Sequence, residues 1–242
     1  MGNPDIELTE QEKARIEEKE RSLIVPYPKV SIAHGTHILS WHSLISHKIN
    51  VMRDKDTKVS EFRRLVEEVT MLICSEAMQK LPMEEYVVET PICVTVGRRI
   101  AGKKLIIEPI LRAGLAMENA VKIIVPNSRT GMLGMFRDEE TLEPQEYFNK
   151  QPKGIDERQV FVLDPMLATG GSADAAIARV KETGCKSITF MCIIAAPQGI
   201  DRLQKNHPDV ELYIGCLDKG LNKDGYIVPG LGDAGDRIFG TK

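Results

Sequence analysis

The chain has 242 residues, of which 42% are hydrophobic and 28% are charged, so it holds enough apolar side chains for a core and enough charge to cover it. Its 32 basic and 35 acidic residues give a formal charge of −3, which argues against a nucleic-acid partner. No apolar run is long enough to cross a bilayer, and the acidic N-terminus lacks the pattern of a signal or transit peptide. We therefore expect a cytoplasmic protein without a membrane partner.

The cysteines indicate a reducing compartment. There are five, no CxxC is present, and most lie within apolar stretches, so we expect small buried hydrophobic residues rather than disulfides. Four of the five histidines lie between His34 and His47, but no Cys or acidic residue stands near them at ligand spacing. The histidines alone are a weak signal for a metal site.

Residues 1–25 are predicted to form a charged N-terminal extension, and residues 26–242 a single domain. Thr9 and Glu12 have the spacing of a capping box, and the scarcity of apolar residues around them indicates a solvated helix. Residues 57–79 then carry apolar side chains at helical spacing, which predicts a long amphipathic helix.

From about residue 103, short β-rich runs alternate with helical ones. Such alternation is typical of an α/β protein with a mostly parallel sheet flanked by helices, where ligands bind beyond the carboxyl ends of the strands. The polar, acidic stretch at 137–154 predicts a long loop or arm that closes over such a site. The predicted strands cover residues 103–109, 130–136, 158–164, 186–196 and 210–216, and the predicted helices cover residues 114–123, 171–183 and 199–206.

The segment VFVLDPMLATGGS (160–172) is the most informative about function. Its strand ends at Asp164, whose carboxylate can accept hydrogen bonds from ribose hydroxyls. TGGS (169–172) then opens a helix, so that hydroxyls and helix-start amides can surround one phosphate. No Gly-Lys-Ser/Thr follows and no G-x-G-x-x-G opens a helix, which excludes a Walker A loop and leaves a dinucleotide site unsupported. Taken alone, the segment also fits an ordinary strand-to-helix turn.

The same segment resembles the motif by which type I phosphoribosyltransferases bind phosphoribosyl pyrophosphate (PRPP). Pro165, in place of a second acidic residue, resembles the uracil phosphoribosyltransferase branch. The resemblance implies the type I phosphoribosyltransferase fold and Mg²⁺ as cofactor, although Pro165 leaves direct chelation of the metal by this loop in doubt. It also implies PRPP contacts from nine consecutive residues: Asp164, Pro165, Met166, Leu167, Ala168, Thr169, Gly170, Gly171 and Ser172.

Two arginines follow predicted strands at corners of the same kind. Arg112 lies where a strand runs into a helix, and Arg137 ends the next strand before the acidic stretch. Planar guanidinium groups suit pyrophosphate, and the carboxyl ends of strands favour a site. Each arginine also fits a surface or salt-bridge role. EPILRAGL and FRDEETLEPQEYF resemble the pyrophosphate-side segments of the family, which implies PRPP contacts from Arg112 and Arg137.

The C-terminal stretch at about 217–242 is glycine-rich but too apolar for a flexible tail, and it is predicted to form a small base-binding hood. Within it, GYIVPGLGDAGDR (225–237) resembles the uracil-binding segment of the family. Backbone groups of fixed polarity suit the acceptor–donor–acceptor edge of uracil and reject cytosine. The resemblance implies uracil contacts from Ile227, Gly232, Asp233 and Ala234. It gives Asp233 a further contact to PRPP, directly or through Mg²⁺, while we expect Asp236 to stabilise the turn.

The three motifs together imply transfer of the phosphoribosyl group of PRPP to N1 of uracil, giving UMP and pyrophosphate in pyrimidine salvage. Members of the family commonly form dimers or tetramers, and some are activated by GTP. The basic candidates for a GTP site are Lys58, Arg63, Arg64 and Lys103.

Three other functions stay open: a phosphoribosyltransferase for another base such as a purine, a nucleotide-sensing RNA-binding regulator, and an inactive homologue serving as a subunit or scaffold. The near-neutral charge and the lack of RNP-like aromatic motifs argue against the regulator. The joint presence of Asp164, Thr169, Arg112, Arg137 and Asp233 argues against the inactive homologue.

Overall fold

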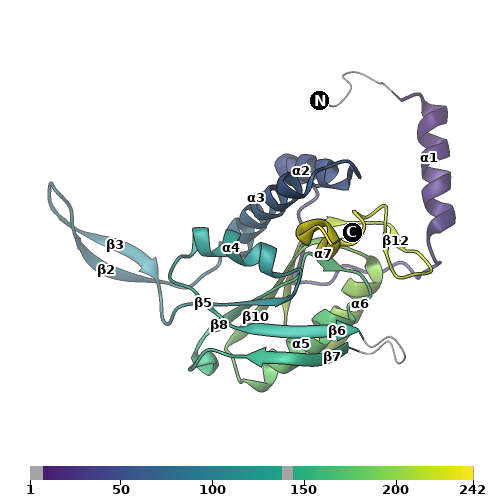
Figure 1. Cartoon of the computed structure of the whole chain (residues 1–242). Coiled ribbons are helices and arrows are strands. Elements are labelled where there is room, and N and C mark those ends of the chain that lie inside the picture. The colour runs from purple at the N-terminus through teal and green to yellow at the C-terminus, as the bar shows by residue number, and fades with distance from the viewer. Residues whose placement is uncertain (1–7, 138–143, 242) are drawn as a thin grey trace.

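A computed structural model describes residues 8–137 and 144–241 of the chain (Figure 1). Within those ranges no helix combines the length and apolarity needed to cross a membrane.

A central sheet forms the body of the molecule. Among the described residues it has nine strands, seven of them in the order β1-β11-β10-β8-β4-β6-β7, while β5 pairs with β4 and β9 with β10. Every pairing is parallel except that of β6 with β7. The strands are β1 (Thr36–Ile38), β4 (Ile106–Leu111), β5 (Arg129–Thr130), β6 (Met132–Arg137), β7 (Pro144–Lys150), β8 (Gln159–Leu163), β9 (Met166–Leu167), β10 (Ser187–Ala195) and β11 (Glu211–Leu217).

Helices bury both faces of this sheet, which is why its central strands are continuous apolar runs (Figure 1). One face is covered by α2, α3, α4 and α7, and the other by α5 and α6. The bounds are α2 (Ser43–Arg53), α3 (Val59–Ala77), α4 (Leu115–Ile124), α5 (Gly171–Glu182), α6 (Pro197–Asn206) and α7 (Ala234–Phe239), with a short 3-10 helix at Ile155–Glu157. The predicted α/β architecture with a mostly parallel sheet is confirmed.

The predicted amphipathic helix is α3. Phe62, Val66, Val69 and Ile73 are fully buried and follow one another at intervals of four, three and four residues, which places them on one stripe of the helix. The five predicted strands and three predicted helices from residue 103 onward are also present, with ends shifted by up to three residues.

The structure corrects the prediction for residues 137–154. Pro144–Lys150 is a strand, β7, which pairs antiparallel with β6 from Met132↔Lys150 to Arg137↔Pro144. Sequence reasoning took the polar side chains for a loop, but β7 is the edge strand of the sheet, where exposed polar residues are expected. The acidic residues 138–143 lie outside the described residues.

A hairpin that the sequence analysis did not predict projects from the body (Figure 1). It pairs β2 (Met83–Glu89) with β3 (Val94–Ile100) in antiparallel register. Cys93 lies at its turn and is exposed, whereas Cys74 and Cys192 are buried. The expectation of buried cysteines is therefore wrong for Cys93.

The N-terminal helix α1 (Glu10–Leu23) stands beside the body and has no buried residue, as predicted for a solvated helix (Figure 1). Its capping box is present, because the Thr9 hydroxyl accepts from the Glu12 amide and the Glu12 carboxylate accepts from the Thr9 amide.

The hood, residues 217–242, is ordered over its described part. It contains β12 (Gly220–Leu221), β13 (Ile227–Val228) and α7. Ile227, Val228, Leu231 and Ile238 are buried, as their apolar character predicted. The short helix α7 was missed, since six residues are too few to give a helical period.

Candidate active site

Three neighbouring strands bring the predicted PRPP residues to one edge of the sheet. Pro109 of β4 pairs with Leu163 of β8, and Leu111 of β4 pairs with Gly134 of β6. Arg112 therefore follows the end of β4 between Asp164, which follows β8, and Arg137, which ends β6. Because the strands are parallel, all three lie at the carboxyl edge, where α/β sheets bind ligands.

The phosphate loop, residues 164–172, runs from β8 into α5. Gly170 is the residue before the helix and has a φ of +78°, a left-handed conformation that favours glycine. Among the described residues, no side chain caps the first turn of α5, which leaves its leading amides available to a ligand. Thr169 and Ser172 flank this turn. The arrangement is that of an anion site at a helix N-terminus.

The first turn of α6 packs against the phosphate loop. A Cβ on Gly199 would lie 2.7 Å from the carbonyl oxygen of Ala168, so only glycine permits this approach. Arg202 of the same helix lies alongside: its Nη1 would be 3.7 Å from a Cβ on Gly171, and its Nε donates to Asp174 at 2.8 Å. Sequence reasoning missed Arg202 because nothing in a helical surface arginine marks it as a neighbour of the loop.

Asp164 is partly buried at the end of β8. Burial raises the pKa of its carboxyl group to about 7, against which the amide of Met166, donating to Oδ1 at 3.3 Å, acts in the opposite direction. The group therefore titrates near neutral pH, where it changes from a hydrogen-bond donor and acceptor to an acceptor alone.

Arg112 lies on a tight corner between β4 and α4. A Cβ on Gly114 would lie 2.4 Å from the carbonyl oxygen of Leu163, so glycine lets this corner press against the end of β8, beside Asp164. The guanidinium of Arg112 stands 5.6 Å from the ring centre of Phe239 in α7. Arg112 thus reaches from the end of β4 toward the hood. For Arg137 the structure describes the main chain, at the end of β6.

The hood closes the other side of this edge, and it holds the four predicted uracil residues on a short path. Ile227 lies on β13, Gly232 and Asp233 follow the turn after it, and Ala234 begins α7. Gly232 and Asp233 are exposed. The Asp233 carboxylate accepts the amide of Asp236 at 2.9 Å and so caps α7. The Asp236 carboxylate accepts the hydroxyl of Thr241 at 2.6 Å, so both aspartates stabilise this segment.

A buried ion pair anchors the hood to the helical layer. Arg53, at the end of α2, donates to both oxygens of Asp218 at 2.8 and 2.6 Å and to the carbonyl oxygen of Gly230 at 2.7 Å. Asp218 also accepts the amide of Gly230 at 2.9 Å. For Arg53, burial alone would lower the pKa, but the bonds to Asp218 outweigh it and raise the pKa.

A second arginine makes a parallel connection. Arg237 of α7 donates to the carbonyl oxygens of Met52 at 2.5 Å, Leu231 at 2.9 Å and Asp54 at 2.6 Å, and its guanidinium lies 4.3 Å from the ring centre of Phe62. The sequence offers one signal for the contacts of Arg53 and Arg237. Arg53 ends an apolar stretch of helix and Arg237 lies in a glycine-rich segment, but the sequence does not identify the partners of either arginine.

The four GTP candidates are divided between different elements. Arg63 donates to the carbonyl oxygen of Ile238 in α7, and Arg64 pairs with Glu61 and Glu68 on its own helix. Lys103 precedes β4 and pairs with Glu157, at the opposite, amino-terminal edge of the sheet. Lys58 is exposed just before α3. The structure therefore does not join Lys103 to the other three.

Within the described residues, no group of three or more His, Cys, Asp or Glu side chains could hold a metal ion. The histidines near the N-terminal side thus form no such group, and neither do Asp233 and Asp236 with any other carboxylate of the hood.

A sequence model of the family described as uracil phosphoribosyltransferase matches residues 39–241. Relatives named uracil phosphoribosyltransferase from Streptococcus mutans and Clostridium perfringens are 54% and 55% identical over 201 residues, which is 83% of this chain and 96% of each relative. A solved structure of a protein from Aquifex aeolicus is 37% identical, with a TM-score of 0.80 over 84% of this chain and 97% of that one. Since the matched residues include the phosphate loop, both arginine corners and the hood, the chain belongs to the uracil phosphoribosyltransferase family.

Proposed function

We propose that this chain transfers the phosphoribosyl group of PRPP to N1 of uracil, giving UMP and pyrophosphate, at the carboxyl edge formed by β4, β6 and β8. The observation that carries this proposal is the register of those three strands, which sets Arg112 between Asp164 and the main chain of Arg137, with the Arg112 guanidinium beside Phe239 of the hood. The product UMP fits a role in pyrimidine salvage in the cytoplasm.

Each part of the edge has a distinct task. The phosphate loop, with Thr169, Gly171 and Ser172, holds the 5′-phosphate against the uncapped N-terminus of α5. Asp164 accepts hydrogen bonds from the ribose hydroxyls. Held at its 5′-phosphate and at its ribose hydroxyls, the sugar presents C1′ to the base. The entropy loss of bringing the two reactants together therefore occurs largely on binding, before the reaction.

The bond from C1′ to pyrophosphate breaks as the bond to N1 of uracil forms. Positive charge develops on the ribose ring and negative charge on the departing pyrophosphate. Arg112 and Arg137 face the leaving group and stabilise its growing charge, which raises kcat because this interaction strengthens in the transition state.

Mg²⁺ fits this site as an ion carried by PRPP. The described residues lack a set of three carboxylate or imidazole ligands, and Mg²⁺ commonly binds through one or two carboxylates together with substrate phosphates and water. Asp233 is the carboxylate that would hold the ion, through PRPP. When bound, the ion neutralises charge on the pyrophosphate.

Uracil is recognised by backbone groups around Ile227, Gly232 and Ala234. The test is a panel of uracil, cytosine, hypoxanthine, guanine and orotate, each with PRPP and Mg²⁺, scored for nucleotide product. We expect conversion of uracil and of analogues with the same hydrogen-bonding edge. Efficient conversion of hypoxanthine or orotate with uracil inert would overturn the base assignment.

The phosphate loop has its own test, Gly171→Val. Apart from its chain neighbours and its own helix, the described atom nearest to a Cβ at this position would be Nη1 of Arg202 at 3.7 Å, so a side chain finds room here and the clash falls on the ligand. We expect a folded protein that no longer binds PRPP in isothermal titration. Unchanged PRPP affinity would remove the loop from the site.

We also propose a homo-oligomer, as a dimer or tetramer, with the projecting β2–β3 hairpin in the interface. An isolated two-stranded hairpin is marginally stable in water, and this one exposes 72% of Val87, 66% of Val94 and 64% of Val96. Val94→Asp should lower the molar mass measured by light scattering, while the exposed, polar Glu85→Gln should not. GTP activation at Lys58, Arg63, Arg64 and Lys103 stays a prediction, and the separation of Lys103 from the others gives it no support.

A further inference from the structure

The last residues of α1 and the segment that joins it to the body, together residues 20–27, lie outside the region that the family model matches, which begins at residue 39. We call this segment the strap. The strap makes none of the proposed substrate contacts, but four of its residues contact the rest of the chain.

Three of those contacts fall on the start of the hood. The amide of Val25 donates to the carbonyl oxygen of Leu221 at 2.8 Å. The side chain of Ile24 lies so close to Gly220 that a Cβ there would come within 2.8 Å of its Cγ2. Glu20 pairs with Lys219. The strap thus engages Lys219, Gly220 and Leu221 in succession.

These three residues are coupled directly to the predicted base-binding strand. Gly220 pairs with Val228 and Leu221 with Ile227 in the small antiparallel sheet of β12 and β13, and the amide of Lys219 donates to the carbonyl oxygen of Val228 at 3.0 Å. β12 is two residues long and lies between the strap on one edge and β13 on the other. A sheet this small has little stability of its own.

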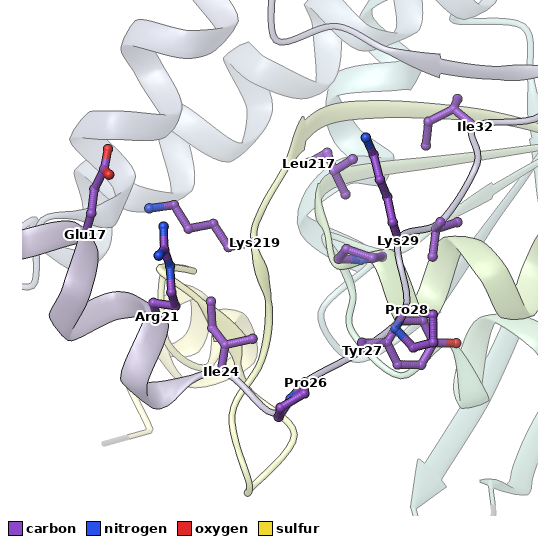
Figure 2. A pocket seen from close by; sticks show the side chains of 12 residues that line it. Glu17, Arg21, Ile24, Pro26, Tyr27, Pro28, Lys29, Ile32, Leu217 and Lys219 are labelled. Atoms are coloured by element: carbon purple, nitrogen blue, oxygen red, sulfur yellow. The ribbon is translucent and has the colours of Figure 1, made fainter. Parts of the chain in front are cut away.

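Two cavities run along the strap. One of about 830 Å³ separates it from the body, and Figure 2 shows Lys219 extending into this space toward Arg21 and Glu17 of α1. The other, of about 550 Å³, lies between α1 and the hood and is lined by Ile16 and Leu23 on one side and by Tyr226, Ile227 and Gly232 on the other. The contacts of the strap with residues 219–221 therefore connect α1 to the proposed base site, residues 227–234, across this gap.

We propose that the strap is a positioning element for uracil recognition, holding β12 and through it the backbone of Ile227. This inference rests on the proposed base site at residues 227–234. If the strap loosens, a smaller fraction of molecules holds Ile227 in the binding geometry, and the apparent affinity for uracil falls by that fraction. The residues proposed to contact PRPP lie on the phosphate loop, at the two arginine corners and at Asp233, none of them on β12 or β13, so PRPP binding should not change.

The test compares steady-state kinetics of the full chain with those of variants in the strap. Ile24→Asp should raise the KM for uracil about fivefold or more, with the KM for PRPP and kcat within about twofold of the parent. Ile24→Val keeps a β-branched apolar side chain against Gly220 and should retain the parent KM. Tyr27→Phe is the matched control, since it removes a bond of 2.7 Å to Asp201 of α6 and no bond to the hood.

A charge exchange supplies a second test that does not depend on how well Ile24→Asp folds. Glu20→Lys should raise the KM for uracil, and adding Lys219→Glu should lower it again by restoring the pair with opposite polarity. An unchanged KM for uracil in both Ile24→Asp and Glu20→Lys, or an equal rise in the KM values for uracil and PRPP, would overturn the proposal.

Gly232→Val separates failure of the strap from failure of the base site. If Gly232→Val raises the KM for uracil while the strap variants do not, the strap has no positioning role and the base site stands. If Gly232→Val leaves the KM for uracil unchanged, the base site itself is misplaced, and the strap proposal falls with it.

Discussion

At the scale of single residues, the ionisation state of Asp164 depends on pH near neutrality. Burial raises the pKa of its carboxyl group to about 7, so the ionised fraction rises steeply across neutral pH. In the proposed site, the ionised form can accept hydrogen bonds from both ribose hydroxyls, whereas the protonated form must donate one of its own.

We predict that the KM for PRPP falls as the pH rises from about 6 to about 8, because the carboxylate becomes available in that interval. Asp164→Asn should raise the KM and flatten its dependence on pH. The measurement is the pH profile of kcat/KM for PRPP in both proteins. If kcat/KM of Asp164→Asn rises with pH as steeply as that of the parent, the titrating group is PRPP or another residue.

Variants of Arg112 and Arg137 separate an effect on PRPP binding from an effect on catalysis. If they hold pyrophosphate as charge builds on it, Arg112→Met or Arg137→Met should lower kcat by about a hundredfold, or about 3 kcal/mol, and should raise the KM for PRPP. Arg137→Lys should recover only part of the rate, since an ammonium group cannot make the bidentate contact.

UMP is the control ligand for these variants because it lacks pyrophosphate, so its affinity by titration should change little. Equal weakening of UMP and PRPP with kcat intact would place the arginines elsewhere in the site.

At the scale of elements, the junction of β4 with the end of β7 contains a buried acid. Glu108 is fully buried and accepts from Gln151 at 3.0 Å through Oε1, while its Oε2 has no partner in the part of the chain that the structure describes. Burial raises its pKa to about 8, which the bond from Gln151 opposes. The Oε1 of Gln151 is also without a partner, so a proton on Glu108 would satisfy both oxygens.

This acid should make stability depend on pH in a defined direction. The unfolded chain releases the proton near a pKa of 4.5 and the folded chain near 8, so between those values the folded state binds more protons and the free energy of unfolding falls as pH rises. Glu108→Gln should remove that slope and stabilise the protein at pH 8 by roughly 1–3 kcal/mol. Urea unfolding at pH 6 and pH 9 measures it, with the exposed Glu61→Gln as control; a parent protein that is equally stable at both pH values would contradict the prediction.

At the scale of the whole molecule, the Arg53–Asp218 pair joins the helical layer to the hood. The Asp218 side chain is 3% exposed and that of Arg53 18%, so removing either partner leaves a buried charge unpaired. Arg53→Met should therefore lower the free energy of unfolding by roughly 3 kcal/mol or more. Lys48→Met breaks a pair from the same helix to Glu68 that is more exposed, at 23% and 29%, and should cost about 1 kcal/mol or less.

Denaturant unfolding of the two variants checks this difference. The double variant Arg53→Met, Asp218→Leu should recover part of the loss, because no charge is then left unpaired. Equal destabilisation by Arg53→Met and Lys48→Met would mean that the hood is held mainly by other contacts, such as those of Arg237.

The sequence by itself determined whatever depends on near neighbours along the chain. The capping box at Thr9 and Glu12, the apolar stripe of α3 and the turn at Gly170 each arise within a few residues, and the alternation of strands with helices set the parallel sheet and its carboxyl edge. The strand ends at Asp164, Arg112 and Arg137 were located for the same reason, whereas their assignment to PRPP comes from the family resemblance.

The tertiary structure alone decided which distant residues meet. Arg53 and Asp218 are 165 positions apart, and nothing local distinguishes either from a surface charge until the fold buries them together. The β7 strand reads as a polar loop because an edge strand obtains its hydrogen bonds from β6 rather than from its own sequence. Hydrogen bonds and burial between segments far apart in the chain depend on where the whole chain packs, and a local pattern of residue types carries no information about that partner.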